Sequence, residues 1–128
     1  MNDLAKEYTI EFTRRPEYLY AVVTGEKISE QIIRDYIAEV VAKSNETGLN
    51  RILLYRDIPA VMREGEVFHT VNASLEALRG KTLALVNPHA AIEKEVKFGV
   101  TVGQNRGGHY ASFNNVADAE AWLLNDRS

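Results

Sequence analysis

Four consecutive large residues, Ile52 to Tyr55, constrain the fold of this chain more than any other stretch. The run contains no polar residue that a strand could turn toward water, so both of its faces need cover, as in a parallel sheet. We therefore predict a strand over Arg51–Asp57 in the middle of a sheet. Functional sites in such sheets usually lie at the carboxyl ends of the strands. The stretch 57–65 is accordingly the first candidate for a site.

The segments around this strand alternate between strand and helix patterns. Alternating apolar residues predict strands, whereas apolar residues three or four apart predict helices. Their order predicts an α/β fold with a mostly parallel sheet of about five strands and four helices, in which the first strand is antiparallel and lies at the edge. The predicted strands are Tyr8–Phe12, Tyr18–Thr24, Arg51–Asp57, Lys81–Asn87 and His109–Phe113, and the predicted helices begin after Ser29, after the link Pro59–Met62, at Asn87–Pro88 and at Asn115.

Composition narrows the class of protein. A chain of 128 residues predicts one domain over 1–128 with its own core. The net charge of −3 argues against a general nucleic-acid binder, and the absence of cysteine excludes disulfides and thiolate metal sites. No apolar run reaches the roughly 20 residues of a membrane span. The first residues lack the pattern of a signal peptide, so we expect a soluble, cytoplasmic protein.

Three segments, in order, resemble the STAS domain of bacterial anti-sigma-factor antagonists, and more closely the divergent stand-alone STAS-like proteins of bacteria. They are the strand Ile52–Asp57 leading to Glu64 and Gly65, the strand and helix start Ala84–Pro88, and Phe113 followed by the helix pattern 117–123. The resemblance implies a STAS/SEC14-like fold with helices mostly on one sheet face. It also implies a non-enzymatic regulatory module that binds another protein. The same architecture occurs in the lipid-binding CRAL-TRIO domains.

The chain departs from the antagonists at the second helix start. There the family keeps a serine whose phosphorylation releases the partner, whereas this chain has Met62, Arg63, Glu64 and Gly65. The usual phosphoswitch is therefore missing. A glutamate at a helix N-terminus is explained by the helix dipole, which it complements by about 0.3–1 kcal/mol.

Two binding functions remain open. In the first, an unidentified protein partner docks reversibly at the carboxyl ends of the strands. In the second, a small apolar or lipid-like molecule lies between the sheet and movable helices. The first hypothesis uses Asp57, Ile58, Pro59, Met62, Arg63, Glu64 and His89, and the second uses Phe68, Val71, Val96 and Val100.

A small enzyme is the third hypothesis. Asp57, Glu64 and His89 could exchange protons at the strand ends, but no recognisable nucleophile accompanies them. The three histidines are about twenty residues apart and fall at opposite edges of the predicted sheet, so we predict neither a metal site nor a cofactor.

The central strands look apolar on both faces, whereas the resemblance places the helices mainly on one. The second face would then need a cover. Three alternatives are the N-terminal segment, a second copy of the chain in a homodimer, or an apolar ligand.

Overall fold

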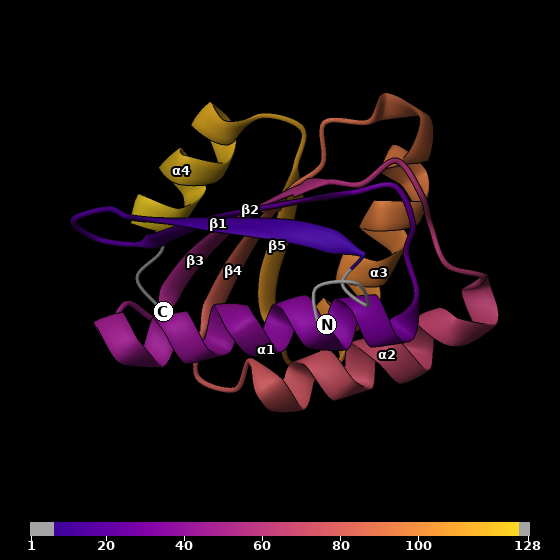
Figure 1. Ribbon diagram of the computed structural model, residues 1–128, viewed down its shortest axis with the longest axis horizontal. Coiled ribbons are helices and arrows are strands. Elements are labelled where there is room, and N and C mark those ends of the chain that lie inside the picture. Colours follow the sequence, from indigo (N-terminus) through magenta and orange to yellow (C-terminus); the bar gives the residue numbers. More distant parts are fainter. Residues whose placement is uncertain (1–6, 126–128) are drawn as a thin grey trace.

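The computed structural model describes residues 7–125, which form a five-stranded sheet flanked by four α-helices (Figure 1). One short 3₁₀ helix, Ala90–Ile92, precedes the third α-helix. The strands are β1 (Tyr8–Arg14), β2 (Leu19–Gly25), β3 (Arg51–Asp57), β4 (Thr82–Val86) and β5 (His109–Phe113), and the helices are α1 (Glu30–Thr47), α2 (Glu64–Ala77), α3 (Glu93–Asn105) and α4 (Val116–Asn125).

The strands lie in the order β1-β2-β3-β4-β5, with β1 antiparallel to β2 and all other neighbours parallel. This confirms the predicted fold class, including the antiparallel edge strand. β3 lies in the middle, and its side chains Ile52, Leu53 and Leu54 are at most 1% exposed. The apolar run in the sequence therefore did identify the central strand.

Successive residues of β3 point to opposite faces of the sheet. Ile52 and Leu54 belong to a core with α1, whereas Leu53 packs in a separate core with α4. Figure 1 shows α4 on one side of the sheet and α1 and α2 on the other. Val100 of α3 belongs to the same core as α1. We call the two sides the three-helix face and the α4 face.

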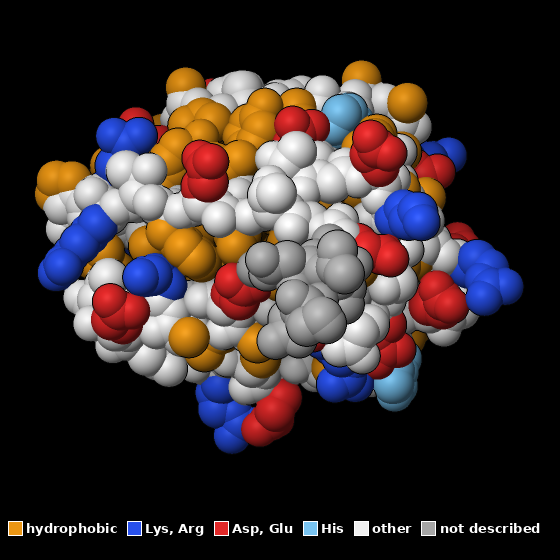
Figure 2. Space-filling view, viewed as in Figure 1, with side chains coloured by type: hydrophobic (Ala, Val, Ile, Leu, Met, Phe, Trp, Pro, Cys, Tyr) orange, Lys and Arg blue, Asp and Glu red, His pale blue; other side chains and the backbone are white. Residues whose placement is uncertain are grey.

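The last helix of the chain itself covers part of the second face, a cover that the three alternatives above did not include. Ala119 and Leu123 of α4 pack on β3 and β4 and are fully buried. Tyr20 and Tyr55 remain partly exposed beside this core. Figure 2 shows apolar side chains gathered between β1 and α4, with acidic and basic groups around them. The N-terminal segment, residues 1–6, lies outside the described residues.

Capping chemistry sets two of the helix starts as expected. The Ile32 amide donates to Ser29 Oγ at 3.1 Å, and the Asp118 amide donates to Asn115 Oδ1 at 2.8 Å. The third predicted start is wrong. The Asn87 side chain bonds both the amide and the carbonyl of His89, which closes a turn, and α3 begins only after the 3₁₀ helix.

Candidate functional site

Helix α2 lies away from the sheet. Its backbone approaches α1 and α3 more than any strand, and Thr70 is its only buried residue. Val67 and Val71 point inward from it but stay partly exposed. A helix of a packed α/β layer normally buries a continuous apolar stripe against the sheet, so space remains beneath α2.

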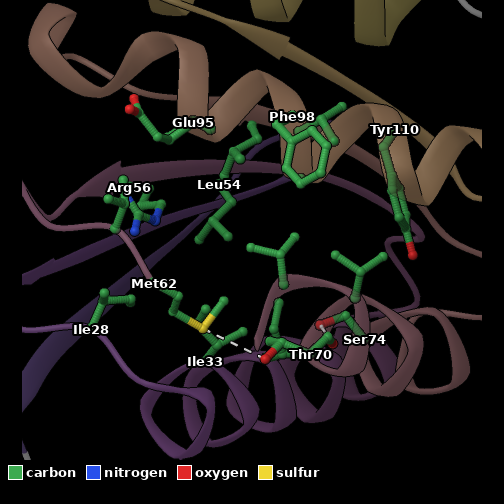
Figure 3. Close-up of a pocket in the computed structure, with 18 of the residues that line it drawn as sticks. Ile28, Ile33, Leu54, Arg56, Met62, Thr70, Ser74, Glu95, Phe98 and Tyr110 are labelled. Carbon is green, nitrogen blue, oxygen red and sulfur yellow. Dashed lines mark hydrogen bonds between the residues drawn. The ribbon is translucent and has the colours of Figure 1, made fainter. Parts of the chain in front are cut away.

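That space is a cavity of 540 Å³ between α1, α2, α3 and the three-helix face of the sheet (Figure 3). Most of its wall is apolar. Leu54 and Leu85 form the floor on the sheet, Ile33 lines it from α1, and Gly99 lines it from α3. Because no side chain projects from Gly99, part of the wall on α3 is backbone.

Arg56 lies at one end of this cavity, and Tyr110 lies at the other (Figure 3). Arg56 follows Ile52 and Leu54 at two-residue steps, so it points to the three-helix face. It is 7% exposed, and it is the only charged side chain that is buried in the described part of the chain. Its Nη1 donates to the Ile58 carbonyl at 3.0 Å, and its Nη2 donates to the Ala60 carbonyl at 2.8 Å.

The other polar groups of the wall are mostly engaged within the protein. Thr70 Oγ1 donates to the sulfur of Met62 at 3.5 Å, and Ser74 Oγ donates to the Thr70 carbonyl at 3.0 Å (Figure 3). Burial raises the pKa of Tyr110 to about 12, so its hydroxyl stays neutral at physiological pH. Burial also raises the pKa of Tyr36, and the neighbouring Arg56 charge opposes that shift.

The structure brings together three of the four residues predicted for a ligand pocket. Val71, Val96 and Val100 line the cavity. Phe68 does not: it is 43% exposed, its ring packs edge-on against Phe98, and the guanidinium of Arg106 lies over it. Position 68 turns away from the cavity because it is not on the same helix face as Val67 and Val71.

Arg56 and Gly99 are two informative cavity residues among those that the sequence interpretation missed. A signal for Arg56 was present, because its two-residue spacing from Ile52 and Leu54 predicts an inward-pointing arginine. Nothing in the sequence around Gly99 indicates that this glycine lines a cavity, because that depends on which elements α3 faces in the fold.

The residues predicted for a partner surface divide into three environments. Pro59, Arg63 and Glu64 are exposed. Ile58 is fully buried in the core and cannot contact a partner, which corrects its inclusion, and Met62 lines the cavity. The remaining two, Asp57 and His89, contact each other.

Asp57 and His89 form the closest ionisable pair at the carboxyl edge, with 2.8 Å between Oδ1 and Nε2. The Asn87 turn holds the backbone of His89 in place. The Asp57 side chain therefore bonds His89, and His89 precedes the 3₁₀ helix instead of lying in the first turn of α3. A base oriented by an acid is half of a nucleophilic site, but no hydroxyl group of the described residues hydrogen-bonds to His89.

The described residues contain neither a metal-binding cluster nor a helix suited to crossing a membrane. Residues 7–125 contain no group of three or more histidine, aspartate or glutamate side chains that could hold a metal ion. In the same part of the chain, no helix has the length and apolar character needed to cross a membrane.

No family model matches the chain, and comparisons with curated proteins and with solved structures also found no match. Function must therefore be argued from the cavity and its surroundings.

Proposed function

We propose that the protein binds a small, mainly apolar molecule in the cavity beneath α2. The cavity is the observation that carries this proposal. Its volume of 540 Å³ lies within the range of roughly 300–1,000 Å³ typical of natural ligand pockets. Such pockets combine apolar walls with a few fixed polar groups, and Leu54, Val96 and Arg56 illustrate that combination here.

Loose packing alone is a poor explanation of a void this large. Protein interiors are packed about as densely as organic crystals. The space is partly open to solvent, but its apolar walls still lack the contacts that a packed interior would give them. Water entering the void would meet mainly apolar walls. A bound apolar molecule supplies the missing contacts.

Helix α2 suits the role of a movable cover. It packs on two helices but hardly on the sheet, and the link 58–63 that precedes it has no regular secondary structure. Elements with few buried contacts open at low free-energy cost. A ligand can therefore enter by displacement of α2 without disruption of the sheet.

The substitution Gly99→Leu tests this proposal, because it adds an apolar side chain to the cavity wall at a position with room for a Cβ atom. A Cβ atom at position 99 would lie 3.9 Å from Val67 Cγ1, an ordinary contact. We expect Gly99→Leu to weaken binding of decanol, measured by calorimetry, by about tenfold or more, since roughly 1.4 kcal/mol of lost contact gives that factor. The melting temperature should not fall, because leucine favours the helix and buries apolar surface.

Gly65→Leu is the matched control. Gly65 lies in α2, is exposed, and has open space around its would-be Cβ. Gly65→Leu adds the same side chain outside the cavity, so decanol binding should stay at the wild-type level. The proposal fails if the wild-type protein binds no decanol, or if Gly99→Leu binds it as well as Gly65→Leu does.

A second candidate is the regulatory interaction module that the STAS resemblance implies. It is favoured by the surface after β3, where Val61, at 39% exposure, adjoins the exposed Arg63 and Glu64. Exposed apolar groups with a charged rim are typical of protein contacts. A partner captured from a lysate should be lost with Arg63→Ala and Glu64→Ala combined; unchanged capture of that partner would rule out this surface.

A further inference from the structure

The positive charge of Arg56 has no carboxylate partner in the described part of the chain. Ion pairs are present elsewhere, but none of them involves Arg56. A buried charge is normally paired or bound to a ligand, because removal from water is costly. Arg56 is 93% buried, since 7% of its surface is exposed, and it lines the cavity.

The contacts that Arg56 does make hold it in place without neutralising it. Its Nη1 and Nη2 donate to the carbonyl oxygens of Ile58 and Ala60, and its other neutral neighbour is the side chain of Tyr36. Carbonyl groups satisfy donors but carry no net charge. A guanidinium has five N–H donors, so donors remain for another acceptor. The contacts also fix the orientation of the side chain, which lowers the entropy cost of ligand binding.

The other charged groups of the cavity lie at its rim. Glu64, Lys94 and Glu95 line it but are exposed to solvent. Figure 3 shows the Glu95 carboxylate pointing away from the cavity. Water screens these groups, whereas the charge of Arg56 acts in the low-dielectric interior. Within the cavity the field is therefore positive at the Arg56 end.

The remainder of the cavity is suited to a hydrocarbon chain. From Arg56 the wall continues along Leu54 and Phe98 toward Tyr110 at the opposite end (Figure 3). One buried positive charge matches one singly charged anion. The planar guanidinium fork matches the two oxygens of a carboxylate or of a phosphate. A phosphate monoester carries a charge of about −1.5 to −2 near neutral pH, however, which is more than one arginine neutralises.

We propose that the ligand is an aliphatic carboxylate, with its carboxylate paired to Arg56 and its hydrocarbon tail extending toward Tyr110. This inference rests on the proposed function, since it names the chemical class that the same cavity takes. It also gives Arg56 two roles: the side chain orders the link between β3 and α2, and it recognises the ligand.

The experiment compares decanoate with decanol on the wild-type protein by calorimetry. The two probes share a chain and differ in the head group. We expect decanoate to bind roughly 10- to 100-fold more tightly, the factor that corresponds to one charge-assisted hydrogen-bonded contact. In Arg56→Gln the ratio of decanoate to decanol affinity should fall to near unity, because the ratio cancels any change in the shape of the cavity. The wild-type comparison needs no variant, so it decides the question even if Arg56→Gln does not fold.

The possible failures are distinguishable. Equal binding of decanoate and decanol by the wild-type protein overturns the carboxylate assignment and leaves the apolar cavity function standing. Tighter binding of decyl phosphate than of decanoate also overturns it. A retained decanoate preference in folded Arg56→Gln assigns recognition to another group and overturns the role of Arg56. Absence of binding by either decanol or decanoate contradicts the proposed function itself.

Discussion

The two faces of the sheet are covered by different numbers of helices, and the face with more helices is the less tightly packed. On the α4 face, Leu53, Ala84 and Leu123 belong to one core and are fully buried. On the three-helix face, α1 packs closely, but the space beneath α2 forms a cavity of 540 Å³. Helix coverage and dense packing are therefore separate properties of a sheet face.

Side-chain size and chain connection explain the difference. Ala84 and Ala119 are small, which lets α4 approach the strands closely. Helix α2 instead follows the irregular link 58–63, and Arg56 bonds two carbonyl groups of that link. The link fixes where α2 begins without bringing its apolar side chains to the sheet. The larger buried core still lies on the three-helix face against α1, so the loose packing there is confined to the surroundings of α2.

Equivalent truncations on the two faces should show the largest difference. Leu53→Ala removes a fully buried side chain from the α4 face, and we expect a loss of about 3–4 kcal/mol in the free energy of unfolding. Leu85→Ala changes the same residue type on the three-helix face, where Leu85 borders the cavity. Fewer contacts are lost there, so we expect about 1–2 kcal/mol.

Urea denaturation of both variants measures the two losses, because the midpoint and slope report the free energy of unfolding. Both leucines lie in interior strands of the parallel sheet, so changes in strand propensity cancel in the comparison. Equal losses would show that the cavity is closed in solution and that the two faces are packed alike.

Two glycines of α3 sharpen the comparison within the three-helix face. A Cβ at Gly103 would lie 2.7 Å from the Tyr110 ring, whereas one at Gly99 would lie 3.9 Å from its nearest atom. Alanine gains roughly 1 kcal/mol over glycine in a helix, so we expect Gly99→Ala to be stabilising by up to that amount. At Gly103 the clash should outweigh the gain and leave a net loss of about 1 kcal/mol.

Thermal unfolding of the two alanine variants tests these opposite signs. The residues lie one turn apart on the same helix, so a general effect of helix propensity would shift both melting temperatures upward. That outcome would show that Gly103 has as much room beside Tyr110 of β5 as Gly99 has beside Val67 of α2. The loose packing would then not be confined to the surroundings of α2.

The fold could be predicted largely because its information is local. The run Ile52–Tyr55, the alternating strands and the caps at Ser29 and Asn115 each depend on neighbouring residues, and all appear in the structure. The start of α3 was misplaced because the side chain of Asn87 closes its own turn instead of capping a helix. Asparagine is common both in such turns and at helix N-caps, so the residue type alone does not distinguish them.

The site was harder to predict because it depends on a space between α2 and the sheet that side chains do not fill. Val71, Val96 and Val100 follow from helical spacing, which the sequence contains. The gap beneath α2 depends on how the link 58–63 places that helix, and no local pattern encodes this distance. Arg56 could have been found by its inward spacing, but its lack of a carboxylate partner required three-dimensional contacts.

The smallest expected effect concerns how α2 is tied to its neighbours. Glu30 of α1 lies 2.9 Å from His69 of α2; the His69 side chain is largely exposed, whereas that of Glu30 is only partly exposed. The bond from His69, followed by that from Arg34, lowers the pKa of the Glu30 carboxyl. A lowered folded-state pKa stabilises the fold above the ordinary carboxyl range, and that contribution is lost as the pH falls through the lowered value. Glu30→Gln should therefore reduce stability slightly at neutral pH and by less in acid.

Hydrogen exchange of the α2 amides shows whether this contact restrains the cover of the cavity. Glu76→Gln is the matched control, because Glu76 pairs with Arg79 at the end of the same helix and touches no other element through that pair. We expect faster exchange in α2 for Glu30→Gln than for Glu76→Gln, since only the first loosens α2 from α1. Equal exchange in the two variants would mean that apolar contacts alone hold α2, and opening of the cavity would then be independent of pH.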